Sequence, residues 1–317
     1  MKKRLILCMA VLMTLAFGYS DAYSWGSATH AFGADRSGRR MFGMNLNEVY
    51  GIMAADIFNY SFELGANPEL YRYLRAHTHG LPGEESFLRV WDEARVWGYE
   101  RNAAFGYVFH NDVWGMDHTA HWQAQSISAP SDFPEGLPPG YVIIKAWQLN
   151  QILSGIPEYA ELGLPEELAI EVCHNLVETA GDILIAREER ALGKKILAAS
   201  LTRTPAFPDL LVRAMGEEHR DLIVTTEREF RRIAALLGGA LMLSEEEAIM
   251  ALSDQMAELG AEYLRVYGIT LDPTVLRPLA EVGIRQAMAI CEDDYLEEIN
   301  ATIRFVEENL ATRGISY

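Results

Sequence analysis

The sequence predicts an all-α protein, a multi-helix bundle that encloses a site, because helical periodicity dominates the chain and strand alternation is scarce. Apolar residues make up 50% of the 317 positions, which is enough for a sizeable core and disfavours a disordered chain. No internal repeat is visible. Residues 25–200 hold most of the candidate site residues, and 201–317 form a helical region that we expect to pack on the same domain.

Local signals place the individual helices. Asn45 with Glu48 three residues later has the spacing of a capping box, and that helix is expected to run toward Phe58. Pro165 suits a first helical position, and Ser244 precedes three glutamates at the start of another helix. Further helices are expected over 101–122, 141–153, 165–192, 244–266 and 275–312, the last with a break near 293–294.

Four prolines between residues 125 and 140 predict a loop. A long loop inside a compact domain is often functional. This one lies between two segments with candidate ligands, so it either borders a site or is a plain surface connection.

The first 24 residues have the pattern of a cleaved signal peptide. Three basic residues are followed by an apolar stretch from Leu5 to Phe17 and by the small residues Ala22 and Ser24. Cleavage after Ser24 would make Trp25 the first residue of a secreted or periplasmic protein. No other stretch reaches the ~18 apolar residues of a membrane span, so we expect no transmembrane segment after cleavage.

The chain is strongly acidic, with a formal net charge of −18. An acidic surface repels nucleic acid at long range, so no stable nucleic-acid complex is expected. Phosphate chemistry is still compatible with this charge, because each bound divalent cation adds a local charge of about +2. The sequence leaves the oligomeric state open.

Histidines and carboxylates occur at spacings that suit a metal centre. The separations of His110, Asp117 and His121 fall on one face of a helix, and His174 and Glu178 lie one turn apart. Zinc takes imidazole nitrogen and carboxylate oxygen, usually with four ligands. Seven of the eight histidines precede residue 175, and this clustering favours zinc ions over histidines that merely fill a core. Cys173, next to His174, is expected in the core.

The candidate ligands are therefore the Trp25 amine and carbonyl, His30, Asp56, His77, His79, His110, Asp117, His121, His174 and Glu178. Asp182, one turn beyond Glu178, is expected either to orient a ligand or to lie on the surface. The nearby aromatics Phe105, Tyr107, Phe109, Trp114 and Trp122 either line a substrate pocket or pack the core.

The order Trp-Gly-x-x-x-His from Trp25, then aspartates and histidines, and finally His-x-x-x-Glu resembles the zinc-dependent phospholipase C family and the related three-zinc single-strand-specific nucleases. The resemblance covers residues 25 to about 185. It departs from the family at one point: the family aspartate lies four residues after the equivalent of His110, where this chain has Trp114. One extra turn or a local bulge would bring Asp117 to that place, with Asp112 as the fallback.

The resemblance implies two to three zinc ions and assigns a set of ligand residues to each ion. Trp25 and His30 would hold one zinc, and His110 would complete another with Asp56 and His79, for which His77 is the alternate. Asp117 would bridge two zincs. The remaining ion would be held by His121, His174 and Glu178.

The resemblance also implies an activity, that of a phospholipase C-like hydrolase with its catalytic domain over 25–200. A zinc-activated hydroxide would attack the phosphorus of a phospholipid headgroup diester or another phosphodiester, with Asp56 and Asp117 as the catalytic carboxylates. The alternatives are a three-zinc nuclease or nucleotidase and a non-catalytic zinc-binding protein outside the cytoplasm.

Overall fold

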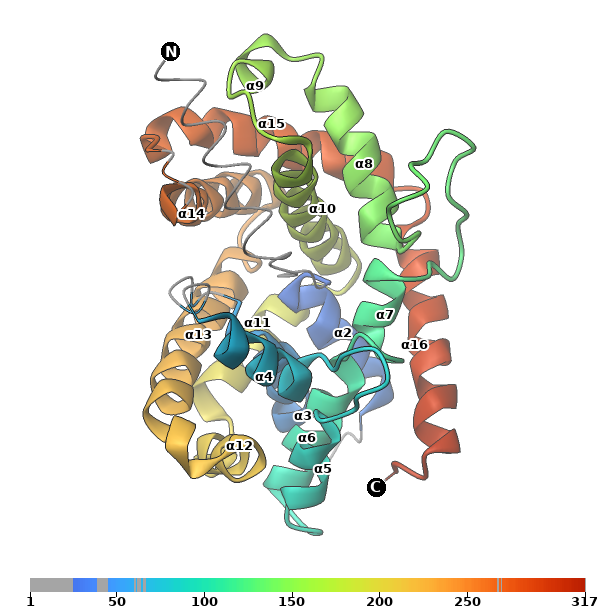
Figure 1. Ribbon diagram of the computed structural model, residues 1–317, viewed down its shortest axis with the longest axis vertical. Helices are drawn as coiled ribbons and strands as arrows, with labels where there is room; N and C mark the ends of the chain where they lie inside the picture. Colours follow the sequence, from blue (N-terminus) through green and yellow to red (C-terminus); the bar gives the residue numbers. More distant parts are fainter. Residues whose placement is uncertain are drawn as a thin grey trace.

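The computed structural model in Figure 1 describes residues 25–38, 45–59, 61, 64, 67–266, 268 and 270–316. The predicted all-α class is confirmed. Within these ranges the chain has no β-strand, and one isolated bridge joins Leu81 and Glu84. The signal peptide expected over 1–24 lies outside the described residues. In the described part of the chain, no helix combines the length and apolar character that a membrane span requires.

The α-helices are Ser27–Ser37 (α2), Leu46–Met53 (α3), Pro68–Thr78 (α4), Leu88–Glu93 (α5), Tyr99–His110 (α6), Met116–His121 (α7), Tyr141–Leu153 (α8), Pro157–Ala160 (α9), Glu166–Glu188 (α10), Leu192–Thr202 (α11), Phe207–Met215 (α12), Arg220–Ala240 (α13), Glu245–Val266 (α14), Pro273–Cys291 (α15) and Tyr295–Thr312 (α16). Short 3-10 turns cover Ala54–Asp56 and Glu217–His219.

Several expected helices match closely. Helix α8 has the predicted bounds, and the break near 293–294 separates α15 from α16. At the start of α14, Ser244 N donates to Glu247 Oε2 at 3.1 Å, and Glu247 N donates back to Ser244 Oγ at 3.4 Å. This reciprocal contact fixes the start of the helix. Pro165 is the N-cap of α10, immediately before its first helical residue.

The expected capping box at Asn45 is wrong. The Asn45 side chain donates to Ala34 O at 3.0 Å and makes no cap hydrogen bond within α3. It thus ties α3 to α2 instead. The helix ends at Met53, before the predicted Phe58, and the following 3-10 turn carries Asp56.

The single helix expected over 101–122 is also wrong, because the chain breaks after His110. Asn111 has a backbone that is not helical (φ −26°, ψ 157°), and its side-chain oxygen accepts hydrogen bonds from the amides of Val113, Trp114 and Gly115. This side-chain turn ends α6 and lets α7 start in a new direction. His110 and Asp117 therefore lie on different helices.

Helix α2 lies at the centre of the molecule, packed against α3, α6, α10, α11 and α16 (Figure 1). Helices α3 and α6 approach closely at two glycines. A Cβ at Gly51 would lie 2.0 Å from Ala103 O, and a Cβ at Gly106 would lie 2.0 Å from Glu48 O. This close packing brings the segment that follows α3 near the end of α6.

Residues beyond 200 pack onto the same core. Thr29 Oγ1 and Tyr295 Oη lie 2.7 Å apart, as do Thr119 Oγ1 and Thr302 Oγ1. Tyr50 Oη donates to Glu227 at 2.6 Å. Residue 200, the expected boundary, falls inside α11 and so does not coincide with the end of an element.

The chain forms a loop over 125–140, as predicted. Its ends meet beside α7, where Ala124 N donates to Pro139 O at 3.0 Å and Gly140 N donates to His121 O at 3.2 Å. The loop therefore borders the site at His121.

Candidate metal centre

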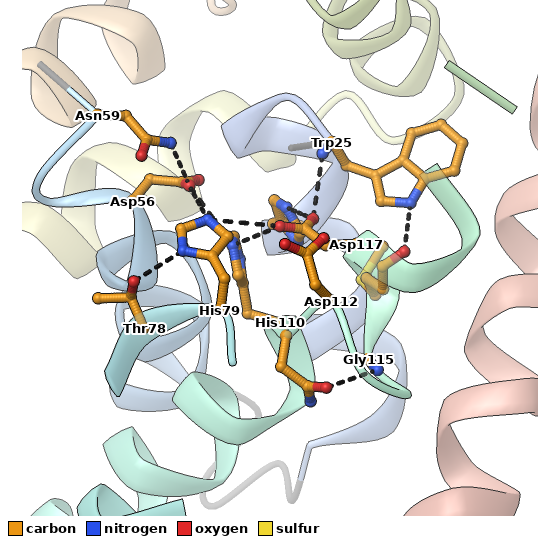
Figure 2. Close-up of polar contacts among 12 residues, drawn as sticks. Trp25, Asp56, Asn59, Thr78, His79, His110, Asp112, Gly115 and Asp117 are labelled. Atoms are coloured by element: carbon orange, nitrogen blue, oxygen red, sulfur yellow. Dashed lines mark hydrogen bonds and ion pairs between the residues drawn. The ribbon is translucent and has the colours of Figure 1, made fainter. Parts of the chain in front are cut away.

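Trp25 is fixed beside Asp117 by its own side chain. The indole Nε1 donates to Met116 O at 2.8 Å, and the ring stacks on Tyr141 with centroids 5.4 Å apart. The residue is 1% exposed. Its backbone nitrogen consequently lies 3.3 Å from Asp117 Oδ1, as Figure 2 shows.

Helix α2 brings His30 to the same carboxylate. His30 Nε2 lies 3.0 Å from Asp117 Oδ1. The start of α2 is held by Asp182 of α10, which accepts hydrogen bonds from Ala28 N at 3.0 Å and Thr29 N at 2.8 Å. A carboxylate at a helix N-terminus satisfies amides that have no partner within the helix.

Asp182 is thus a buried residue that positions the helix carrying His30, and the surface alternative for it is wrong. The fit is tight, because a Cβ at Gly26 would lie 2.4 Å from Asp182 Oδ1. The glycine after Trp25 is therefore required by the close approach of α10.

Asp56, His79 and His110 converge on the other side of Asp117 (Figure 2). His110 Nε2 lies 2.8 Å from Asp117 Oδ2 and 3.4 Å from Asp56 Oδ1. His79 Nε2 lies 3.3 Å from Asp56 Oδ1 and 3.6 Å from Asp117 Oδ2. Two carboxylates and two imidazoles from four segments therefore face one small volume.

We call Trp25 N with the side chains of His30, Asp56, His79, His110 and Asp117 the Asp117 cluster. All five side chains are buried. His79 Nε2 and His110 Nε2 are inaccessible to water, and neither makes an aligned hydrogen bond to any described residue despite the nearby carboxylates. A metal cation between these nitrogens and the carboxylate oxygens would give each buried nitrogen a partner.

The electrostatics of this cluster favour a cation. Burial raises the pKa of Asp117, but the imidazoles of His110 and His30 outweigh it and hold this pKa well below its usual range. Burial likewise raises the pKa of Asp56, and His110 and His79 reverse the shift. Both carboxylates are therefore ionised.

The three imidazoles of this cluster differ in the direction of their pKa shifts. Burial lowers the pKa of His30 and of His79, so both rings are neutral and offer a lone pair. Burial also lowers the pKa of His110, but the carboxylates of Asp117 and Asp56 outweigh it and raise this pKa well above the usual value. Two ionised carboxylates and one imidazolium leave a net negative charge, and a bound cation would replace the His110 proton.

Two supporting residues were missed by the sequence analysis. Thr78 Oγ1 lies 2.7 Å from His79 Nδ1, and Asn59 Nδ2 donates to Asp56 Oδ1 at 2.7 Å. Their only sequence signal is proximity to a candidate ligand, one and three residues away. Contacts of this kind orient ligand side chains.

A second group of side chains adjoins the first through Asp117. His174 Nε2 and Glu178 Oε1 lie 2.6 Å apart on α10, and the rings of His121 and His174 have centroids 5.5 Å apart. Asp112 Oδ1 lies 2.6 Å from His121 Nδ1. We call Asp112, His121, His174 and Glu178 the His121 cluster.

The two clusters differ in how closely their donor atoms approach one another. Three groups in the described part of the chain have candidate ligand atoms within 4.8 Å of one another: His30, His110 and Asp117; Asp56, His79 and His110; and Asp112, Asp117 and His121. His174 and Glu178 belong to none of these groups, although the His174 ring lies beside that of His121 and Glu178 is paired with His174.

His77 does not join either cluster. Its Nδ1 lies 2.8 Å from Tyr73 O, and its side chain lines a separate surface pocket of about 440 Å³ with Arg72 and Arg89. Of the two alternates in the Ala76–His79 segment, the structure therefore brings only His79 to Asp117. The reason is local: His77 lies in α4 and His79 is its C-cap residue with helical backbone angles, and residues two apart on a helix point about 200° apart.

The aromatics near the site are mostly core residues. Phe105, Tyr107, Phe109 and Trp114 are buried, whereas Trp122, next to His121, is 48% exposed. Cys173 and Cys291 are buried free thiols, so the ligand set of both clusters consists of nitrogen and oxygen.

Fold and site together define an all-α protein with adjoining buried groups of histidines and carboxylates that could hold metal ions. Comparisons of the chain with family models, with curated proteins and with solved structures found no match.

Proposed function

We propose that the protein is a zinc-dependent phosphodiester hydrolase, similar to phospholipase C, that acts outside the cytoplasm after removal of its first 24 residues. One observation carries the proposal: Trp25 N, His30 and His110, from segments far apart in the chain, all lie within 3.3 Å of the Asp117 carboxylate. A purely structural core has little reason to bury this many ionisable groups together.

The donor set supports zinc. Imidazole nitrogens and carboxylate oxygens without thiolates suit Zn²⁺, and four ligands per ion is the usual number. Trp25, His30 and Asp117 would hold one ion, and Asp56, His79, His110 and Asp117 would hold a second. His121, His174 and Glu178 would hold a third, for two to three ions in all.

Bound zinc supplies a Lewis acid for the phosphate oxygens and lowers the pKa of bound water to about 7. Asp117 lies between the groups and, being ionised, offers one oxygen to each side. Asp56 is ionised and oriented by Asn59. These two carboxylates are therefore the candidates to orient a water molecule and to hold its proton. The buried surroundings exclude bulk water and strengthen every charge interaction in the site.

A substrate would contact Trp122 at the exposed border of the site. Its exposed ring follows His121, at the border formed by the 125–140 loop, and an aromatic face attracts a quaternary ammonium or stacks on a base. Together with the acidic net charge of −18, this supports a phospholipid diester ahead of a long polyanionic nucleic acid.

The test is metal analysis of protein that begins at Trp25, paired with a substrate screen. The screen compares phosphatidylcholine vesicles, single-stranded DNA and a chromogenic phosphodiester. We expect two to three zinc ions per chain and chelator-sensitive release of the phosphorylated headgroup.

Other outcomes are distinguishable. Hydrolysis of single-stranded DNA without lipid turnover would assign the protein to the nuclease alternative. Bound zinc with no hydrolysis of any diester would leave a non-catalytic zinc-binding protein. Full diesterase activity without zinc would contradict the proposal.

A further inference from the structure

Asp112 uses both carboxylate oxygens to join a histidine to an arginine. Oδ1 lies 2.6 Å from His121 Nδ1, and Oδ2 accepts a hydrogen bond from Arg75 Nη2 at 2.7 Å. The Arg75 and Asp112 side chains are only 10% and 11% exposed, so water screens this pair weakly.

The backbone of Asp112 is held as firmly as its side chain. Asp112 N donates to His79 O at 2.8 Å, and its carbonyl oxygen lies 3.0 Å from His118 Nδ1. It follows Asn111, whose side chain forms the turn between α6 and α7. Asp112 thus connects the end of α4, which carries His79, to α7, which carries His121.

This arrangement decides which ring nitrogen of His121 faces the metal side. An imidazole that donates Nδ1–H to a carboxylate presents Nε2 as its lone-pair donor, and the carboxylate increases the basicity of that nitrogen. Arg75 keeps the second oxygen of Asp112 occupied and its charge compensated. Asp112 with both oxygens engaged in this way is poorly placed to bridge two ions, which was its fallback role.

We propose that Asp112 is a positioning residue that fixes the ring orientation and tautomer of His121, with Arg75 as the clamp that holds Asp112. The inference rests on the proposed zinc function, because its effect is exerted on the ion held by His121, His174 and Glu178. Asp112 itself contributes no metal–ligand bond.

The test compares Asp112→Asn and Asp112→Ala with wild type in zinc-binding titrations against a competing chelator. Loss of a residue that orients a metal ligand costs about 10–100-fold in metal affinity. We expect that loss for one ion in both variants, with the full number of ions restored at saturating zinc. Arg75→Gln should weaken the same ion less.

A matched control is Asp35→Asn. Asp35 is also a buried carboxylate paired with a cation, Lys195, but it lies outside both clusters. Its replacement should leave all zinc affinities unchanged. Circular dichroism and thermal unfolding check that each variant is folded.

Two results would overturn the inference. Permanent loss of one zinc from folded Asp112→Ala at saturating zinc would make Asp112 a ligand, and unchanged affinities in all Asp112 variants would make it a bystander. Failure of the proposed function is separate: wild-type protein that binds zinc but cleaves no diester would refute the hydrolase, while the affinity comparison would still be valid.

Discussion

The Asp117 cluster and the His121 cluster share one border but are built differently. In the first, four buried side chains and a backbone nitrogen surround the Asp117 carboxylate, and the imidazole nitrogens nearest to it lie 2.8 to 3.6 Å from its oxygens. In the second, the Glu178 side chain is 14% exposed, His121 and His174 are joined mainly through neighbouring rings, and the 125–140 loop lies alongside. The two clusters therefore differ in access to solvent: the Asp117 cluster is closed, and the His121 cluster is the more exposed of the two.

The largest effect is expected from Asp117→Ala, which removes the carboxylate at the centre of the Asp117 cluster, one that also lies within 4.8 Å of donor atoms of Asp112 and His121. We expect loss of more than one zinc and a fall in diesterase activity on the order of 10³-fold, because the donors on each side lose their common partner. Zinc content by mass spectrometry under native conditions and the rate on a chromogenic diester measure both effects. Unchanged zinc content would show that the Asp117 cluster is not a metal site.

His174→Ala tests the His121 cluster alone. The variant should lose about one zinc and most activity, roughly 10²-fold, while the Asp117 cluster keeps its ions. Asn175→Ala is the control, since Asn175 is the exposed neighbour on the same helix. Loss of all zinc from folded His174→Ala would mean that the two clusters do not bind metal independently.

His79→Ala and His77→Ala form a matched pair on one segment, with side chains 2% and 4% exposed. Only His79 faces Asp56 and Asp117, so only its removal should lower zinc affinity and activity, by about 10–100-fold. Metal titration of the two variants gives the comparison directly. Equal losses would indicate a general packing effect, and a larger loss for His77→Ala would reverse the assignment.

The Trp25 amine provides a finer test of the Asp117 cluster. A free amine with a pKa near ~7.7–8 loses its proton to a metal more readily than a lysine does, whereas a preceding residue turns the nitrogen into an amide. Protein starting Met-Trp25 should bind about one zinc fewer than protein with Trp25 first, and unfold at a lower temperature. Equal zinc content and equal activity in the two forms would make the N-terminus a bystander.

The smallest expected effect concerns Asp182, which holds α2 through the amides of Ala28 and Thr29 and is not itself a proposed ligand. Burial raises its pKa to about 7, against the hydrogen bonds from Ala28 and Thr29. The folded state therefore binds this proton more tightly than the unfolded one, where the carboxyl titrates near ~3.9. Its contribution to stability is fully present below that pH and is lost as pH rises through about 7.

Asp182→Asn should remove the loss of stability that wild type shows as pH rises through about 7. The difference in melting temperature between the two proteins, measured in chelator from pH 4 to 8, should change by a few degrees. The Asn variant gains relative to wild type as pH rises. A difference that stays constant across this range would show that Asp182 does not titrate there.

Local patterns were enough to predict much of the fold. The helix over 141–153 and the break near 293–294 depend on nearby residues alone, through periodicity and helix-ending signals. The two errors near the site have one cause. The side chains of Asn45 and Asn111 bind other parts of the backbone, and this competition with regular helix is not visible from spacing.

The sequence by itself determined the all-α class and supplied the pool of histidines and carboxylates, because composition and period are properties of the chain. Only the tertiary structure decided which of them meet. His79 rather than His77 faces Asp117, Asp112 holds His121, and Asp182 holds α2. The physical reason is that a side chain's direction depends on where its helix ends and how that helix packs, and neighbouring helical residues point about 100° apart.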